Sequence, residues 1–184
     1  MKSNDGDLKS KMDTHEVIKI DNVCDCMYHN YICIGHPLGY IPKEPEFSCL
    51  MDMGTYQIEI SHAEFWVWSE ILEKRETNKE NSGIVALLLN KKGLVDTHNC
   101  MGMDFIFDCV PYRQGFGCIH NKKQAIINGS VPVYVPDIYL NIWRVSNGIN
   151  TVKEIAKALD LGINDMINHL IDLQMVGTMY IKSF

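Results

Sequence analysis

The chain has 184 residues, of which 46% are hydrophobic and 22% are charged, and its formal net charge is −6. A chain of this length forms one domain or two small ones, and this composition is typical of a globular protein with a buried core. The acidic balance disfavours a non-specific polyanion binder. No apolar run approaches the roughly 18 residues of a membrane span. We therefore expect no membrane partner.

The N-terminal residues 1–22 are predicted to form a polar tail, with a weakly alternating strand pattern only at residues 16–20. The tail lacks the apolar stretch of a secretory signal, which favours a cytoplasmic protein. The seven cysteines are odd in number, so reduced thiols are expected rather than a disulfide framework.

Five potential metal ligands follow within a short segment. Zinc is usually held by regularly paired Cys and His residues. The spacing here is irregular, and the chain contains no C-x-x-C pair. The pattern favours a strand with buried thiols, so neither a metal nor any other cofactor is expected. The five residues that would form the alternative zinc site are Cys24, Cys26, His29, Cys33 and His36.

The first half of the chain predicts a small sheet followed by helices. Ser61-His62-Ala63-Glu64 is a capping box, and it opens a helix that carries Phe65, Trp68 and Leu72. Residues 76–83 are polar and rich in turn formers, so the second helix of this half is predicted to be shortened or lost. The apolar residues after position 83 mark a last helix, which Gly93 ends.

The second half repeats this plan with clearer signals. Asn128-Gly129 is a strong hairpin signal, Asp137 is expected to cap a helix that carries Trp143, and Thr151 opens a second capping box with Glu154. A third helix has apolar residues at helical spacing and ends at Gly177. The strands predicted here are Phe105–Val110, Gly117–Ile119, Gln124–Ile127, Val131–Val135 and a closing Met179–Ile181.

These landmarks recur in the same order, which indicates an internal repeat. Gly39-Tyr40, Trp68 and Gly93 correspond to Gly115-Phe116, Trp143 and Gly177, at offsets of 76, 75 and 84 residues. The prediction is an α+β fold of two tandem winged-helix-like units, each a small antiparallel sheet followed by two or three helices. Their expected ranges are 23–98 and 99–184, joined near residues 97–103.

Three motifs of the second unit carry a family resemblance. Ile142-Trp143 precedes an Asn147-Gly148 turn, Thr151-Val152-Lys153-Glu154-Ile155 starts a helix, and Leu173 lies four residues before Gly177. In these motifs residues 105–181 resemble PqqD-like domains, the elements that recognise precursor peptides during the maturation of ribosomally made peptides. The similarity reaches residues 31–95 only through the repeat.

The resemblance implies a binding function. In that family a leader peptide adds to the sheet edge beside the third helix, which here would be a groove between Val131–Val135 and Ile163–Val176. Pro132 departs from the pattern because it removes one main-chain donor from that edge. The expected function is therefore non-catalytic binding of a peptide or protein, such as a precursor peptide or a maturation enzyme. The groove residues implied are Val131, Val133, Val135, Asn164, Ile167, His169, Ile171 and Gln174.

Two other functions are weighed against binding. A winged-helix transcription regulator shares the same skeleton, but the third helix of the second unit carries Asp165 and Asp172 and no cation, which disfavours contact with phosphates. The lysines of the first unit, Lys79, Lys91 and Lys92, form only a modest patch. Cys118 and His120 could share one strand face, yet no third catalytic group accompanies them, so no enzyme is expected. A homodimer is compatible with each of these functions.

Overall fold

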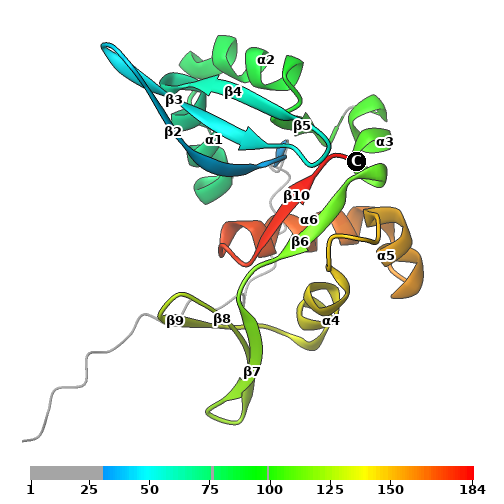
Figure 1. The fold of residues 1–184 in the computed structure, drawn as a ribbon. Helices are drawn as coiled ribbons and strands as arrows, with labels where there is room; N and C mark the ends of the chain where they lie inside the picture. Colours follow the sequence, from blue (N-terminus) through cyan, green and yellow to red (C-terminus); the bar gives the residue numbers. More distant parts are fainter. Residues whose placement is uncertain (1–30, 76, 99) are drawn as a thin grey trace, which may run out of the picture.

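The computed structural model describes residues 31–75, 77–98 and 100–184 (Figure 1). The predicted tail, its weak strand and the candidate ligands Cys24, Cys26 and His29 lie outside the described residues. The predicted α+β class is confirmed: the described residues form six α-helices and four small antiparallel sheets.

The first half places four strands before its helices. Strand β3 lies between β2 and β4 in a three-stranded sheet, and β1 pairs with β5 in a separate two-stranded one. The elements are β1 (Tyr31–Cys33), β2 (His36–Lys43), β3 (Glu46–Asp52), β4 (Gln57–Ser61), α1 (His62–Lys74), the 3-10 helix η1 (Lys79–Asn81), α2 (Ser82–Asn90) and β5 (Leu94–Asp96).

The second half has the same order of paired strands. Strand β8 lies between β7 and β9, and β6 pairs with the last strand, β10. The elements are α3 (Cys100–Asp108), β6 (Val110–Arg113), β7 (Phe116–His120), β8 (Lys123–Asn128), β9 (Val131–Tyr134), α4 (Asp137–Val145), α5 (Val152–Ala158), α6 (Ile163–Met175) and β10 (Met179–Lys182). Helix α5 corresponds in order to η1, so the first half has only a 3-10 turn where the second has a helix.

Local capping explains where several helices begin. Both predicted capping boxes are present: Ser61 with Glu64 at α1, and Thr151 with Glu154 at α5. In each box the hydroxyl accepts a backbone N–H, and the glutamate carboxylate accepts the N–H of the capping residue. Asp137 is not a cap, because Pro136 precedes the helix and Asp137 lies in its first turn.

The predicted strand Phe105–Val110 is wrong, because most of it belongs to helix α3 and the strand begins only at Val110. Ile106 is fully buried, and residues 103 and 107 pack against the core on the same helix face. This spacing of three and four residues is helical. A Cβ at Gly102 would lie 2.4 Å from the Asp96 carbonyl oxygen, so only glycine lets α3 approach β5 this closely.

One hydrophobic core extends through both halves, and helix α6 lies at its centre. Figure 1 shows α6 behind the β6–β10 ribbon, between the first sheet and the helices α4 and α5. It contacts α1 of the first half as well as α4, α5 and β10 of its own half. The Gln174 amide of α6 donates to the Cys33 carbonyl of β1 at 2.7 Å. A helix at this position joins the halves instead of presenting a free face.

A polar network also crosses between the halves. The Arg75 guanidinium at the end of α1 forms an ion pair with Asp172 of α6, and both side chains are mostly buried. The Tyr139 hydroxyl of α4 donates to the other oxygen of Asp172 at 2.5 Å. Burial lowers the pKa of Arg75, and the Asp172 carboxylate compensates part of the cost of burying its charge.

Replacement Asp172→Ala should therefore destabilise the protein strongly, because it leaves a buried guanidinium and a buried hydroxyl without their shared acceptor. The expected loss is about 3 kcal/mol of unfolding free energy, measured by urea denaturation. The control Asn168→Ala changes an exposed residue of the same helix and should stay within about 0.5 kcal/mol. Equal effects of the two variants would contradict a bridging role for Asp172.

Candidate functional site

The exposed edges of the four sheets are the first places to look for a partner, because an edge strand carries unpaired main-chain donors and acceptors. Which residues point outward follows from the ladder. The Val135 N–H donates to the Gln124 carbonyl, so alternate residues of β8 bond to β9 and the others bond to β7. The outward residues are then Gly117 and Ile119 on β7, and Pro132 and Tyr134 on β9.

The two-stranded ribbons have covered edges. The Cys33 carbonyl of β1 accepts from Gln174 at 2.7 Å. The Ile181 carbonyl of β10 accepts the Gly35 N–H at 2.7 Å, and the Pro111 carbonyl of β6 accepts the Gly148 N–H at 3.1 Å. On β6 the Arg113 N–H also donates to a carbonyl of the chain after α4. These outward groups are thus satisfied within the described fold.

The edges of the first three-stranded sheet are also obstructed. On β4 the Glu59 carbonyl accepts from the Lys91 ammonium at 3.3 Å, and the Ser61 N–H donates to Glu64 at 2.7 Å. On β2 the register shifts between Pro37 and Gly39, and Pro42 follows. Prolines and irregular register are the usual devices that prevent strand addition.

In the second three-stranded sheet, β9 and β7 differ. Of the two outward residues of β9, Pro132 lacks an N–H, so that edge offers only the donor of Tyr134. Strand β7 contains no proline and no residue with a fixed charge. Both of its outward residues, Gly117 and Ile119, therefore offer a donor and an acceptor. Of the edges of the two three-stranded sheets, β7 thus offers a partner both main-chain donors and both main-chain acceptors of its outward residues.

Apolar side chains accompany the β7 edge. The side chain of Ile119 is 74% exposed and that of Phe116 is 60% exposed. Gly117 lies over helix α4, where a Cβ would approach the Trp143 ring to 3.1 Å. Phe116 and Ile119 are three residues apart and therefore point to opposite faces of the strand, so each face beside this edge carries one exposed apolar side chain.

The sheet of β7, β8 and β9 is also locally basic. Residues 110–136 contain Arg113, Lys122 and Lys123 and no Asp or Glu, whereas the whole chain carries a net charge of −6. The next residue, Asp137, contacts this sheet through a hydrogen bond from the Gln124 amide of β8. All three cations are exposed. Arg113 lies over the Trp143 ring at 5.1 Å, and Lys123 lies 5.9 Å from the centre of the Tyr134 ring. Cations therefore flank β7 before its first residue and after its turn.

Five of the eight side chains expected in the implied groove are buried. Val133, Val135, Ile167, Ile171 and Gln174 are buried in the core or between the halves. The side chains that remain at least partly accessible are Val131, Asn164 and His169. Burial lowers the pKa of His169, and Asp165 partly opposes this shift. The α6 residues of this set are buried because α6 packs against α1 of the first half, a long-range contact that local motifs of the second half do not encode.

The metal and catalytic candidates that lie among the described residues make the following contacts. The Cys33 thiol is fully buried, so its pKa is raised, and it lies 3.6 Å from the Trp68 carbonyl. His36 packs on the Tyr180 ring at 4.3 Å. Within the described ranges, no three His, Cys, Asp or Glu residues are grouped to hold a metal. His120 of β7 hydrogen-bonds to the Tyr134 hydroxyl of β9 across the sheet.

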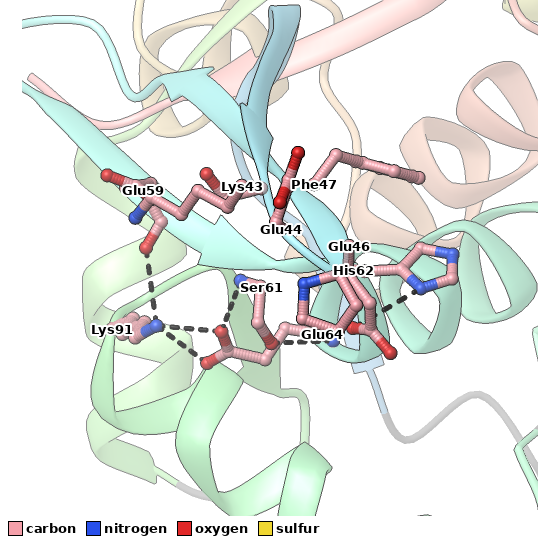
Figure 2. Close-up of a pocket in the computed structure, with 11 residues that line it drawn as sticks. Lys43, Glu44, Glu46, Phe47, Glu59, Ser61, His62, Glu64 and Lys91 are labelled. Atoms are coloured by element: carbon pink, nitrogen blue, oxygen red, sulfur yellow. Dashed lines mark hydrogen bonds and ion pairs between the residues drawn. The ribbon is translucent and has the colours of Figure 1, made fainter.

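A cavity of about 380 Å³ lies in the first half, between the β2–β3 turn and the start of α1 (Figure 2). Its polar walls are joined by ion pairs from Lys43 to Glu59 and from Lys91 to Glu64. Burial raises the pKa of Glu64, but hydrogen bonds from Lys91 and Ser61 outweigh burial and lower it overall. These contacts connect β4, α1 and the end of α2, so the charged groups of the cavity walls stabilise the packing of the first half.

The same ion pair bears on the lysine patch of the first half. Lys91 is neutralised by Glu64 at 2.7 Å, and Lys92 lies over the Phe105 ring at 5.0 Å. The exposed residues of α2 are uncharged. Of the three lysines of this patch, Lys79 and Lys92 are exposed and keep a charge that is unpaired within the described residues, and Lys91 is paired with Glu64.

Comparisons with known proteins give no relative: no family model matches the chain, and neither do curated proteins or solved structures. The described helices include none that is both long and apolar enough to cross a bilayer.

The charge of Glu64 should make a pH-dependent contribution to stability. Its native pKa lies below the ordinary value of 4.5, so the contribution is present above that value and is lost as the pH falls through the native pKa. We expect Glu64→Gln to lose about 1 kcal/mol at pH 7, a modest value because Lys91 is partly exposed. The difference in unfolding free energy between the variant and the wild type should shrink as the pH falls below 4.5, as measured by urea denaturation at each pH.

The matched control is Glu70→Gln, since Glu70 forms only a helical-turn ion pair with the exposed Lys74. It should change stability by less than about 0.5 kcal/mol at either pH. A Glu64→Gln effect of the same size at pH 7 and at pH 4 would show that the carboxylate charge is not the cause.

Proposed function

We propose that this protein is a non-catalytic binding module that takes an extended segment of a partner polypeptide along the edge of β7. The observation that supports this most is the contrast between β7 and the other edges: it combines two outward donors, two outward acceptors and exposed apolar side chains. Main-chain hydrogen bonds would give affinity, and the side chains on either face would give selectivity.

The resemblance to peptide-recognition domains supports the same class of function, although it implies the edge of β9. Pro132 leaves that edge with a single donor, and the adjoining helix α6 is covered by the first half. The proposal therefore keeps the mode of binding and moves it to the opposite edge of the same sheet. We place the binding in the cytoplasm, because the thiols of Cys33, Cys49, Cys109 and Cys118 are unpaired.

A transcription regulator is the second candidate, and one observation favours it. Lys122 and Lys123 lie at the tip of the β7–β8 hairpin, where a winged-helix protein could place cations against a DNA backbone. Two observations weigh against it: α6 buries its apolar face within the protein, and its charged residues are acidic. A phosphate chain also has no donors for the outward carbonyls of β7.

Selection of peptides from a random twelve-residue library displayed on phage tests the proposal. The full chain serves as target, and a chain with Ile119→Pro serves for counter-selection. The Ile119 N–H points away from β8, so proline removes the outward donor without breaking the β7–β8 ladder. We expect enriched peptides that bind the wild type and bind Ile119→Pro at least about tenfold more weakly.

Ile119→Thr is the matched control, because threonine keeps the N–H and suits a strand. It should retain most of the binding of the selected peptides. If the selected peptides bind all three chains equally, the β7 edge is not the site. If a random-sequence DNA duplex shifts in a gel at physiological salt while no peptide is enriched, the regulator is the better account.

A further inference from the structure

The charged side chains around β7 indicate the charge of the partner strand. We propose that the strand recognised at β7 is acidic, with carboxylates at its ends and an uncharged, partly apolar middle. This inference rests on the proposed function, since it names the chemistry of the segment that the edge would take. It starts from the local excess of three cations over no carboxylates in residues 110–136 of an otherwise acidic chain.

The positions of the cations set the pattern. Arg113 lies three residues before β7, and Lys122 and Lys123 lie in and just after the turn that follows it. The five residues of β7 span about 16 Å, so the two ends of a strand of similar length would lie near Arg113 and Lys122, whereas the Lys123 ammonium lies toward the Tyr134 ring of β9. Between them, Phe116 and Ile119 offer uncharged apolar surface. A carboxylate in the middle of the partner strand would face no cation on β7.

Two contacts fix the guanidinium of Arg113 in an orientation that can pair with a carboxylate. One guanidinium nitrogen donates to the Arg144 carbonyl at 2.8 Å, and the guanidinium lies over the Trp143 ring. These contacts fix the orientation of the guanidinium while it remains exposed. An Arg fork held in this way can pair with both oxygens of a carboxylate. Arg144 is itself exposed on α4 and adds a fourth cation at the same end.

An acidic peptide fits the edge better than a nucleic acid does. The outward carbonyls of Gly117 and Ile119 need donors, which a peptide backbone supplies and a phosphate backbone does not. The apolar side chains beside them would also be left in water by a phosphodiester. The cations therefore favour a negatively charged partner, and the main-chain and apolar groups favour a polypeptide over a nucleic acid.

Fluorescence anisotropy with two labelled peptides tests the proposal. The peptides are Glu-Glu-Thr-Val-Thr-Val-Thr-Glu-Glu and the same sequence with every Glu replaced by Lys, each carrying the same fluorophore. We expect the acidic peptide to bind the full chain at least about tenfold more tightly at low salt, with the ratio falling as salt is added. A random-sequence DNA duplex with the same label is the third probe.

Two double variants have equal net charge and separate local from global electrostatics. Lys122→Glu with Lys123→Glu should remove the preference for the acidic peptide. Lys153→Glu with Lys157→Glu changes exposed residues of α5, which Figure 1 shows away from β7, and should keep the preference. A similar loss in both variants would mean that only the overall charge matters, which overturns the inference.

The remaining outcomes distinguish this inference from the proposed function. If Ile119→Pro abolishes binding of both peptides and the two bind equally, the edge is the site but the acidic partner is wrong. If neither peptide binds at millimolar concentration, or binding is indifferent to Ile119→Pro, strand addition at β7 is itself wrong. If the duplex alone binds and Lys122→Glu with Lys123→Glu abolishes it, the cations serve a nucleic acid.

Discussion

The packing of helix α6 against both halves of the chain is the constraint on which the rest of the structure depends. Its apolar residues fill the common core, Gln174 satisfies an outward carbonyl of β1, and Asp172 joins Arg75 of α1 to Tyr139 of α4. Each of these contacts would cost free energy to break, because it would leave a buried polar group without a partner. The third helix of the second half is therefore structural, and neither DNA nor a peptide can use its inner face.

Because α6 is committed in this way, a partner must use other surfaces, and the sheet edges are the places where main-chain groups can remain unpaired. The two ribbons and the first sheet satisfy or obstruct their edges with carbonyl contacts, prolines, a register shift and the Lys91 ammonium. The second sheet blocks one edge with Pro132 and leaves the other with its donors, its acceptors and exposed apolar side chains. Among the described residues, the β7 edge keeps both outward donors and both outward acceptors unpaired, which gives a chemical reason to bind a strand there.

Sequence patterns anticipated what local chemistry decides. The capping boxes at Ser61 and Thr151, the Asn128-Gly129 turn and the order of strands and helices were all predictable. Patterns misassigned Phe105–Val110 because a short apolar run fits a strand or a helix equally, and its approach to β5 settled the choice. Several side chains of the implied groove are buried, and for Gln174 the reason is long-range: its amide contacts a carbonyl 141 residues away. The uninterrupted, proline-free strand at residues 116–120 was the available signal for the β7 edge.

Hydrogen exchange of the β7 amides, followed by NMR on the free protein, tests the central claim most directly. If β7 is an open edge, exchange should alternate along the strand: the amides of Phe116, Cys118 and His120, which bond to β8, should be protected, and those of Gly117 and Ile119 should exchange rapidly. Protection of Gly117 and Ile119 in the free protein, equal to that of their neighbours, would contradict the account, because another segment or a second copy would already cover the edge.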